Sequence, residues 1–143
     1  MGRRCTGPSE ATSDLCRVTP GATLDAGGLI ALDRNDRRVI VLVARAAETG
    51  ARITVPATAL AQAIRRPERQ LRLARLIRQP TTDVVALDRV DATSVGRLLA
   101  ASGTSDVVDA HVVICARRSR QNIVTSYPDD LTRLDPAAQL IIL

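Results

Sequence analysis

Five short apolar runs, separated by segments with helical spacing, constrain the fold of this chain more than any other feature. Some carry apolar residues at consecutive positions, as in Val84-Val85 and Ile123-Val124, which is typical of strands buried on both faces of a sheet. The predicted strands are residues 22–24, 52–55, 84–87, 122–125 and 140–143. Strands that alternate with helices favour parallel pairing through right-handed crossovers. We therefore expect an α/β fold: a three-layer α/β/α sandwich with a short, five-stranded, mainly parallel sheet.

Capping residues divide the segments between these strands into helices. Asp36 and Gly50 bound one helix, Pro56 begins another, and Thr104 or Ser105 is expected to cap the last long one. The predicted helical segments are residues 28–33, 37–48, 56–64, 67–77, 92–102, 106–118 and 129–134. This order places a helix between each pair of consecutive strands, as parallel pairing requires.

Aromatic residues are almost absent, because the chain has no Phe, no Trp and one Tyr, Tyr127. The core must therefore be built from Val, Leu, Ile and Ala. The same deficit argues against modules that stack bases on aromatic side chains, such as RRM and OB domains. A chain of 143 residues suits a single domain, and a domain of this size can bury a core without disulfides or structural metal.

The first 20 residues differ in composition from the rest. They are rich in Gly, Ser, Thr, Pro and charge, so we expect a loose N-terminal extension over residues 1–20 and a folded domain over residues 21–143. No apolar run reaches membrane-spanning length, and no apolar stretch of a signal peptide follows the charged start. The odd number of cysteines, 3, is typical of a reducing compartment. These features predict a cytoplasmic protein without a membrane partner.

Basic charge is supplied by arginine alone. All 20 basic residues are Arg, and the formal net charge is +5, so mechanisms that need a P-loop lysine, a Schiff-base lysine or a phospho-receiver lysine are excluded. The densest run contains Arg65, Arg66 and Arg69 and continues to Arg78. Such a run can be a solvated surface, or it can bind the phosphate backbone of a nucleic acid. We retain Arg65, Arg66 and Arg69 as candidates for binding RNA phosphates.

Three aspartates are the candidate catalytic residues. Asp25 directly follows a predicted buried strand, where it could cap a helix or bind a cation. Asp106 and Asp109 are three positions apart and share a helix face. Asp109 is flanked by apolar residues, and a buried carboxylate requires a compensating cation. In a chain without lysine, that partner is arginine or a hard divalent ion, for which Mg²⁺ or Mn²⁺ with oxygen ligands is the expectation.

His111 and Cys115 stand one helical turn apart and could in principle face one metal ion. No further pair of ligands with metal-binding spacing follows them, so a core thiol beside an unrelated histidine is the favoured interpretation. A Cys–His nucleophile pair is not favoured either, because the surrounding apolar run does not support a thiolate.

Several segments resemble PIN domains of the VapC type, the toxins of bacterial toxin–antitoxin pairs. The strand and first acid of the family resemble Thr23-Leu24-Asp25-Ala26, and its acid-bearing helix resembles Asp109-Ala110-His111-Val112. The resemblance includes residues 23–30, 55–65, 109–116 and 123–131 and covers about residues 22 to 143. It implies the PIN fold and a Mg²⁺-dependent endoribonuclease, in which metal-activated water attacks an RNA phosphodiester.

The resemblance also implies roles for individual residues. Asp25 would be the first acid and Asp109 the third, with Asp106 an additional acid. Two positions depart from the family pattern, since Gln62 stands at the second acid and Tyr127 at the fourth. Asp129 and Asp130 lie nearby, although the family motif does not place a ligand there. The expected supporting residues around the metal are Gln62, Thr104 and Ser126.

Two functional hypotheses follow. In the first, the chain is an active metal-dependent endoribonuclease toxin that holds Mg²⁺ or Mn²⁺ with Asp25, Asp106 and Asp109. In the second, the fold is kept, but the loss of charge at Gln62 and Tyr127 leaves a weak or inactive PIN domain that binds antitoxin or RNA through its arginines. For either hypothesis the resemblance implies a homodimer, a small cognate antitoxin and an RNA partner.

Overall fold

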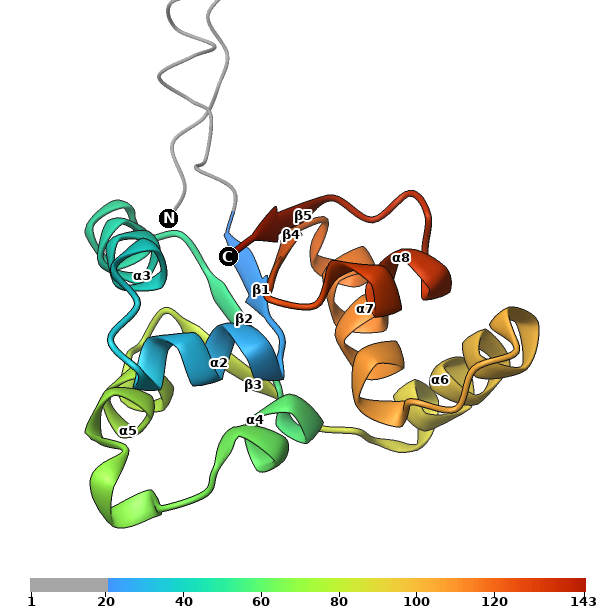
Figure 1. Cartoon of the computed structure of the whole chain (residues 1–143), viewed down its shortest axis with the longest axis horizontal. Helices are drawn as coiled ribbons and strands as arrows, with labels where there is room; N and C mark the ends of the chain where they lie inside the picture. The colour runs from blue at the N-terminus through green and yellow to red at the C-terminus, as the bar shows by residue number, and fades with distance from the viewer. Residues whose placement is uncertain (1–20) are drawn as a thin grey trace, which may run out of the picture.

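The computed structural model describes residues 21–143 as seven α-helices, one 3-10 helix and a five-stranded sheet (Figure 1). All strands are parallel, in the order β3-β2-β1-β4-β5. Their bounds are β1 Ala22–Leu24, β2 Ile53–Pro56, β3 Thr82–Val85, β4 Asn122–Thr125 and β5 Leu140–Ile142. This arrangement confirms the predicted α/β class. The predicted extension over residues 1–20, with Cys5 and Cys16, lies outside the described residues.

The strands differ in burial according to their place in the sheet. β1 and β2 are buried throughout, and β4 is buried at all but its first residue. The edge strands β3 and β5 are only partly covered. The prediction that Val84-Val85 belongs to a strand buried on both faces is therefore wrong, since Val84 is 44% exposed. A run of apolar residues does not distinguish an edge strand from a central one, because that depends on the pairing order.

The helices lie on both sides of the sheet. Figure 1 shows α3 and α5 on one side of the strands and α6, α7 and α8 on the other. The helical bounds are α2 Ala26–Asp33, α3 Arg37–Thr49, α4 Ala57–Ala63, η1 Pro67–Arg69, α5 Leu71–Arg78, α6 Arg89–Ser102, α7 Val107–Ser119 and α8 Pro128–Leu134. Within residues 21–143 no single helix has the length and apolar composition to cross a membrane; only α6 and α7, taken together as a bent pair, meet those two criteria.

Helix boundaries follow capping residues more closely than apolar periodicity. Asp36 caps α3 and Gly50 ends it in the left-handed conformation, as predicted. The expectation that Thr104 or Ser105 caps α7 is wrong, because the carboxylate of Asp106 accepts the hydrogen bond from the Asp109 backbone N–H. α6 also begins earlier than residue 92, because Asp88 caps it in the same way.

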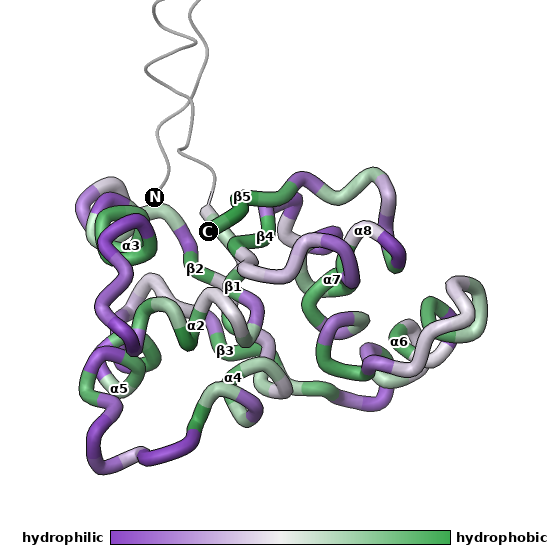
Figure 2. The backbone as a smooth tube through the Cα atoms, in the orientation of Figure 1, coloured by the Kyte–Doolittle hydropathy of each residue, from purple (hydrophilic) through white to green (hydrophobic). Residues whose placement is uncertain are grey.

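The core joins the sheet to its helices without any aromatic side chain. Among the described residues its main cluster contains only Val, Leu, Ile and Ala, including Leu24 in β1, Leu29 in α2 and Val112 in α7, and the thiol of Cys115 is buried as well. Figure 2 shows apolar residues along the central strands and polar residues around α5 and in the segment before it. The interior therefore depends on close packing of aliphatic side chains.

One close approach positions the start of α2 against the sheet. A Cβ atom on Gly28 would lie 2.8 Å from the carbonyl oxygen of Val124, so only glycine allows α2 to begin this close to β4. As a result the residues that follow β1 and β4, Asp25 and Ser126, are neighbours at the carboxyl edge of the sheet. In open parallel sheets this edge is where ligands bind.

Candidate active site

Asp25 is fixed at the end of β1 by its role as the cap of α2. Its side chain is buried, and Oδ1 accepts a hydrogen bond from the Gly28 backbone N–H at 2.7 Å. Burial raises the pKa of Asp25, while hydrogen bonds from the Thr125 hydroxyl and from the backbone of Gly28 and Gly27 oppose that rise. The helix cap is therefore real, and it leaves a desolvated carboxylate at the edge of the sheet where a ligand would bind.

Asp109 lies in the first turn of α7 and is half-buried. Its pKa is raised to about 7, first by burial and then by the negative charges of Asp106, Asp25 and Asp130. The structure thus brings Asp25, Asp106 and Asp109 into one electrostatic neighbourhood, although they are up to 84 positions apart in the chain. Asp106 is exposed at the start of the same helix, where its carboxylate caps the backbone.

Asp130 adds a fourth carboxylate from α8. It lines a cavity of about 290 Å³ together with Asp106, Asp109 and Arg133. The sequence offers two adjacent acids here and no means of choosing between them; in the structure it is Asp130, and not Asp129, whose charge raises the pKa of Asp109. A partial signal was available, because Asp130 and Arg133 are three apart on a helix and share a face.

No ion pair offsets this negative charge within residues 21–143. The described ion pairs are Arg38–Asp36, Arg52–Asp83, His111–Asp91, Arg117–Asp135 and Arg118–Asp91. The acids around Asp109 belong to none of them. A cluster of carboxylates that lacks a cationic partner fits a hard divalent ion with oxygen ligands.

The carboxylates surround Asp109 without converging on one point. In the described part of the chain, a single group of three His, Cys, Asp or Glu side chains has all its ligand atoms within 4.8 Å of one another, and it is Asp91, His111 and Cys115. The oxygens of Asp25, Asp106 and Asp109 are spread more widely. These side chains would have to draw closer around an ion.

The predicted supporting residues have different surroundings. Ser126 lies beside Asp25, since its backbone nitrogen and the Oδ1 of Asp25 are 3.2 and 3.3 Å from the same Cβ position on Gly27. Thr104 lines the cavity that contains Asp109, and its hydroxyl lies 2.9 Å from that of Ser102. Gln62 is exposed on α4, and none of the hydrogen bonds described for residues 21–143 joins it to an acid.

The predicted phosphate-binding arginines lie apart from the acids. Arg65, Arg66 and Arg69 are exposed between α4 and α5, where the side chain of Gln70 accepts hydrogen bonds from the backbone of the first two. None of the three lines the cavity that contains Asp109. This segment therefore has a local structural role, and its cations remain open to solvent.

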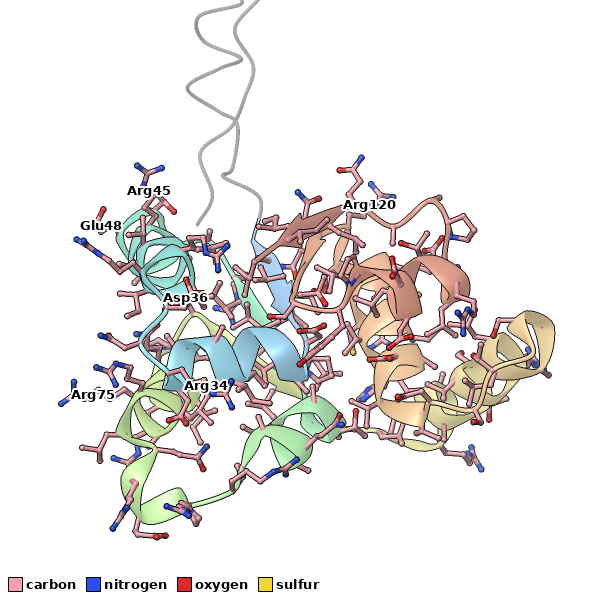
Figure 3. All side chains as sticks on the ribbon, in the orientation of Figure 1. Arg34, Asp36, Arg45, Glu48, Arg75 and Arg120 are labelled. Atoms are coloured by element: carbon pink, nitrogen blue, oxygen red, sulfur yellow. The ribbon has the colours of Figure 1, made fainter. Side chains whose placement is uncertain are left out.

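Two other arginines line cavities that contain predicted site residues. Arg133 shares the cavity of Asp109, and Arg34 lines a second cavity, of about 370 Å³, with Gly27, Ser126 and Tyr127. Figure 3 shows Arg34 beside α2, whereas Arg45 and Arg75 project outward at the periphery. Sequence reasoning missed Arg34 and Arg133, because neither belongs to the arginine run of residues 65–78.

The comparisons with known proteins bear on the fold. The sequence matches no model of a protein family, and it matches no curated protein. Among solved structures, the fold is similar to that of a chain in the crystal structure of VapBC2 from Rickettsia felis bound to a DNA fragment from their promoter. The match covers 86% of this chain and 98% of that chain, with a TM-score of 0.61 and 14% sequence identity. This chain therefore has the PIN-like α/β/α fold that its motifs implied.

Proposed function

We propose that this chain is a metal-dependent endoribonuclease and the cytoplasmic toxin of a toxin–antitoxin pair. The observation that carries the proposal is the environment of Asp109, a half-buried carboxylate with a pKa raised to about 7 by burial and by three neighbouring acids. No described ion pair offsets that charge. The similarity of the fold to a chain of the VapBC2 structure supports the same assignment.

Asp25 and Asp109 would hold Mg²⁺ or Mn²⁺, with Asp106 and Asp130 contributing further negative charge. Such an ion, when bound, activates water and offsets charge on a phosphoryl oxygen. The chain supplies the rest: the Gly28 N–H orients the Asp25 carboxylate, and Asp109, whose raised pKa of about 7 leaves it partly protonated near neutral pH, becomes fully ionised when a cation enters. Arg133 lines the cavity of Asp109, Arg34 lines the cavity that contains Gly27 and Ser126, and both would bind the phosphates of the RNA.

Asp130 is proposed to offset the loss of a carboxylate at Tyr127. The Tyr127 side chain is 69% exposed, and a protonated phenol is a poor ligand for a hard cation. Three residues later, in the first turn of α8, Asp130 brings an acid to the cavity of Asp109. The site then keeps four acids from three parts of the chain.

A second candidate function rests on Gln62 and Tyr127. Neither side chain supplies a negative charge, and both are exposed. A domain with this deficit would bind RNA or an antitoxin without cleaving RNA. In both versions the partners are an RNA and a small antitoxin, with a homodimer as the expected assembly.

The test compares RNA cleavage by matched aspartate variants. We expect Mg²⁺- or Mn²⁺-dependent cleavage by the wild type, a loss of at least a hundredfold in Asp109→Asn, and a clear loss in Asp130→Asn. The neighbouring substitution Asp129→Asn serves as the control, because it removes an equal charge from the same helix. Equal activity of wild type and Asp109→Asn would rule out the metal mechanism. Metal-independent RNA binding without cleavage would favour the second candidate.

A further inference from the structure

A second group of metal-ligating side chains lies apart from the acids, between α6 and α7. Asp91 of α6 and His111 and Cys115 of α7 are 3%, 0% and 1% exposed. One carboxylate oxygen, one imidazole nitrogen and the thiol sulfur all lie within 4.8 Å of one another. His111 is two residues after Asp109, so the two side chains point about 200° apart around the helix. The group is therefore separate from the acidic cavity.

His111 has one ring nitrogen held and the other without a partner. Its Nδ1 lies 2.7 Å from the Thr58 hydroxyl oxygen. Its Nε2 is buried, makes no hydrogen bond within the described residues, and lies 3.7 Å from Oδ2 of Asp91. That separation is too long for a hydrogen bond. Buried polar atoms are seldom left unpaired, so this nitrogen points to a ligand between His111 and Asp91.

The carboxylate of Asp91 likewise has one oxygen held by a neighbouring side chain and the other facing the proposed site. Arg118 forms an ion pair with its Oδ1, while Oδ2 is the oxygen that faces Nε2 of His111. Protein metal sites commonly fix each ligand through its remaining polar atom. Thr58 does this for the histidine and Arg118 for the aspartate.

The spacing of the ligand atoms also suits a tetrahedral ion. Zn–N and Zn–O bonds of about 2.0–2.2 Å, at a tetrahedral angle, separate the two ligand atoms by about 3.4 Å. The corresponding atoms of His111 and Asp91 are 3.7 Å apart. A small movement of either side chain brings both within bonding distance of one ion.

We propose that Asp91, His111 and Cys115 bind a divalent transition metal, with Zn²⁺ the ion that fits best. One nitrogen, one sulfur and one carboxylate oxygen form a set that favours zinc over magnesium. A thiolate and a carboxylate neutralise both charges of the ion, and a water molecule completes the tetrahedron. Arg118, whose side chain is 54% exposed, reaches from the surface to pair with Asp91.

Binding involves one proton. Burial raises the pKa of the Cys115 thiol to about 11, so the metal-free protein holds it protonated. The thiol loses this proton to solvent as the sulfur–zinc bond forms, and the affinity therefore increases with pH. Burial also lowers the pKa of His111, with the Asp91 charge opposing and the Arg118 charge adding to the fall, which favours the neutral imidazole that a metal requires.

The metal would act as a structural link. α6 buries only two of its side chains, Asp91 and Val95, and Figure 1 shows it at the edge of the molecule, beside α7. An ion shared by Asp91, His111 and Cys115 would fasten α6 to α7. The segment that connects these helices, residues 103–106, lines the cavity of Asp109, so the link would also steady the acidic site.

The test is a Co²⁺ and Zn²⁺ titration of the metal-stripped full chain. Cys5 and Cys16 lie outside the described residues, so the starting protein is the Cys5→Ser/Cys16→Ser variant. We expect one equivalent of Co²⁺ to give a sulfur-to-cobalt charge-transfer band, Zn²⁺ to displace it, and Zn²⁺ to raise Tm. Cys115→Ser should abolish the band, and Asp91→Asn should weaken binding at least tenfold. Asp109→Asn should leave the band unchanged.

Two results would overturn the proposal. One is a starting variant that shows no charge-transfer band and no rise in Tm with Zn²⁺. The other is a band that persists in Cys115→Ser. If the substituted chains fail to fold, X-ray absorption on the zinc-loaded starting variant decides. A coordination shell with one sulfur supports the site, and a shell of oxygen and nitrogen alone refutes it.

Discussion

The negative charge of Asp109 is disfavoured both by burial and by the carboxylates around it. Burial and three nearby acids raise its pKa to about 7, from 3.8 for an unperturbed aspartate. Between these two values the folded protein binds more protons than the unfolded chain. The contribution of Asp109 to the stability of the metal-free protein therefore falls as pH rises from about 4 through about 7. The same charge that destabilises the free fold makes the site receptive to a cation.

Asp109→Asn is accordingly expected to stabilise the metal-free protein. The variant removes the unfavourable charge, so its Tm should exceed that of the wild type at pH 8, and the difference should shrink toward pH 4. Thermal unfolding in the presence of a chelator, at pH 4, 6 and 8, measures this directly. A difference that does not change with pH would show that Asp109 does not titrate as described.

At the scale of elements, Asp106 has two separable roles. Its carboxylate caps α7 by accepting the Asp109 N–H at 2.9 Å, and its charge raises the pKa of Asp109. The first role needs only a side-chain oxygen, whereas the second needs a negative charge.

Substitution separates the two roles. Asp106→Ala is expected to cost about 1 kcal/mol of stability through the lost cap. Asp106→Asn should keep most of that stability, because asparagine caps helices well, and should weaken Mg²⁺ binding if the charge matters. Chemical denaturation and metal titration of both variants provide the readouts. Ser105→Ala is the control, because Ser105 precedes the cap residue Asp106 and does not itself cap α7. Equal destabilisation by Ala and Asn would contradict the capping role.

Two helical glycines give a second contrast. A Cβ on Gly28 would lie 2.8 Å from the Val124 carbonyl oxygen, whereas a Cβ on Gly96 in α6 meets nothing within 4 Å. Gly28→Ala must displace α2 from β4, and we expect it to lower the free energy of unfolding by about 1–3 kcal/mol. Gly96→Ala should increase the free energy of unfolding by about 0.5–1 kcal/mol, because alanine has a higher helix propensity than glycine.

The denaturation midpoints of these two variants should move in opposite directions. Because Gly28 also donates its N–H to Asp25, Gly28→Ala should weaken metal binding as well. A neutral effect of Gly28→Ala would mean that the approach of α2 to β4 is not needed for the fold.

At the scale of the molecule, the excess of arginine should govern the affinity for RNA. The net charge is +5, yet among residues 21–143 Arg133 is the one arginine that lines the acidic cavity. In the Asp109→Asn background, which separates binding from cleavage, the logarithm of the RNA binding constant should fall linearly with the logarithm of salt concentration. Arg133→Gln should reduce the salt slope by about 1.

The variant to compare with Arg133→Gln is the triple substitution of Arg65, Arg66 and Arg69 to Gln. These side chains lie outside the acidic cavity, so they should affect overall affinity but not the position of cleavage. If the triple variant changes the cleavage site and Arg133→Gln does not, the RNA binds along the segment between α4 and α5 and the prediction is wrong.

The sequence by itself determined the class of fold and most of its elements. Short aliphatic runs, aspartate caps and glycine ends are local signals, and they predicted five strands, the order of helices and an aliphatic core. They also marked Asp25 and Asp109 as candidate site residues, because an acid at the end of a buried strand or inside an apolar helix requires compensation; their role in a site stays a prediction. Local signals were weakest at strand β3, whose exposure depends on its place at the edge of the sheet.

The tertiary structure alone decided which distant residues meet. The order β3-β2-β1-β4-β5 brings the ends of β1 and β4 together, and the packing of α8 selects Asp130 over Asp129 as the neighbour of Asp109. The same applies to Asp91, which no sequence spacing connects to His111 and Cys115. Burial, charge and metal affinity depend on separations through space, and these are set only when non-local elements pack against one another.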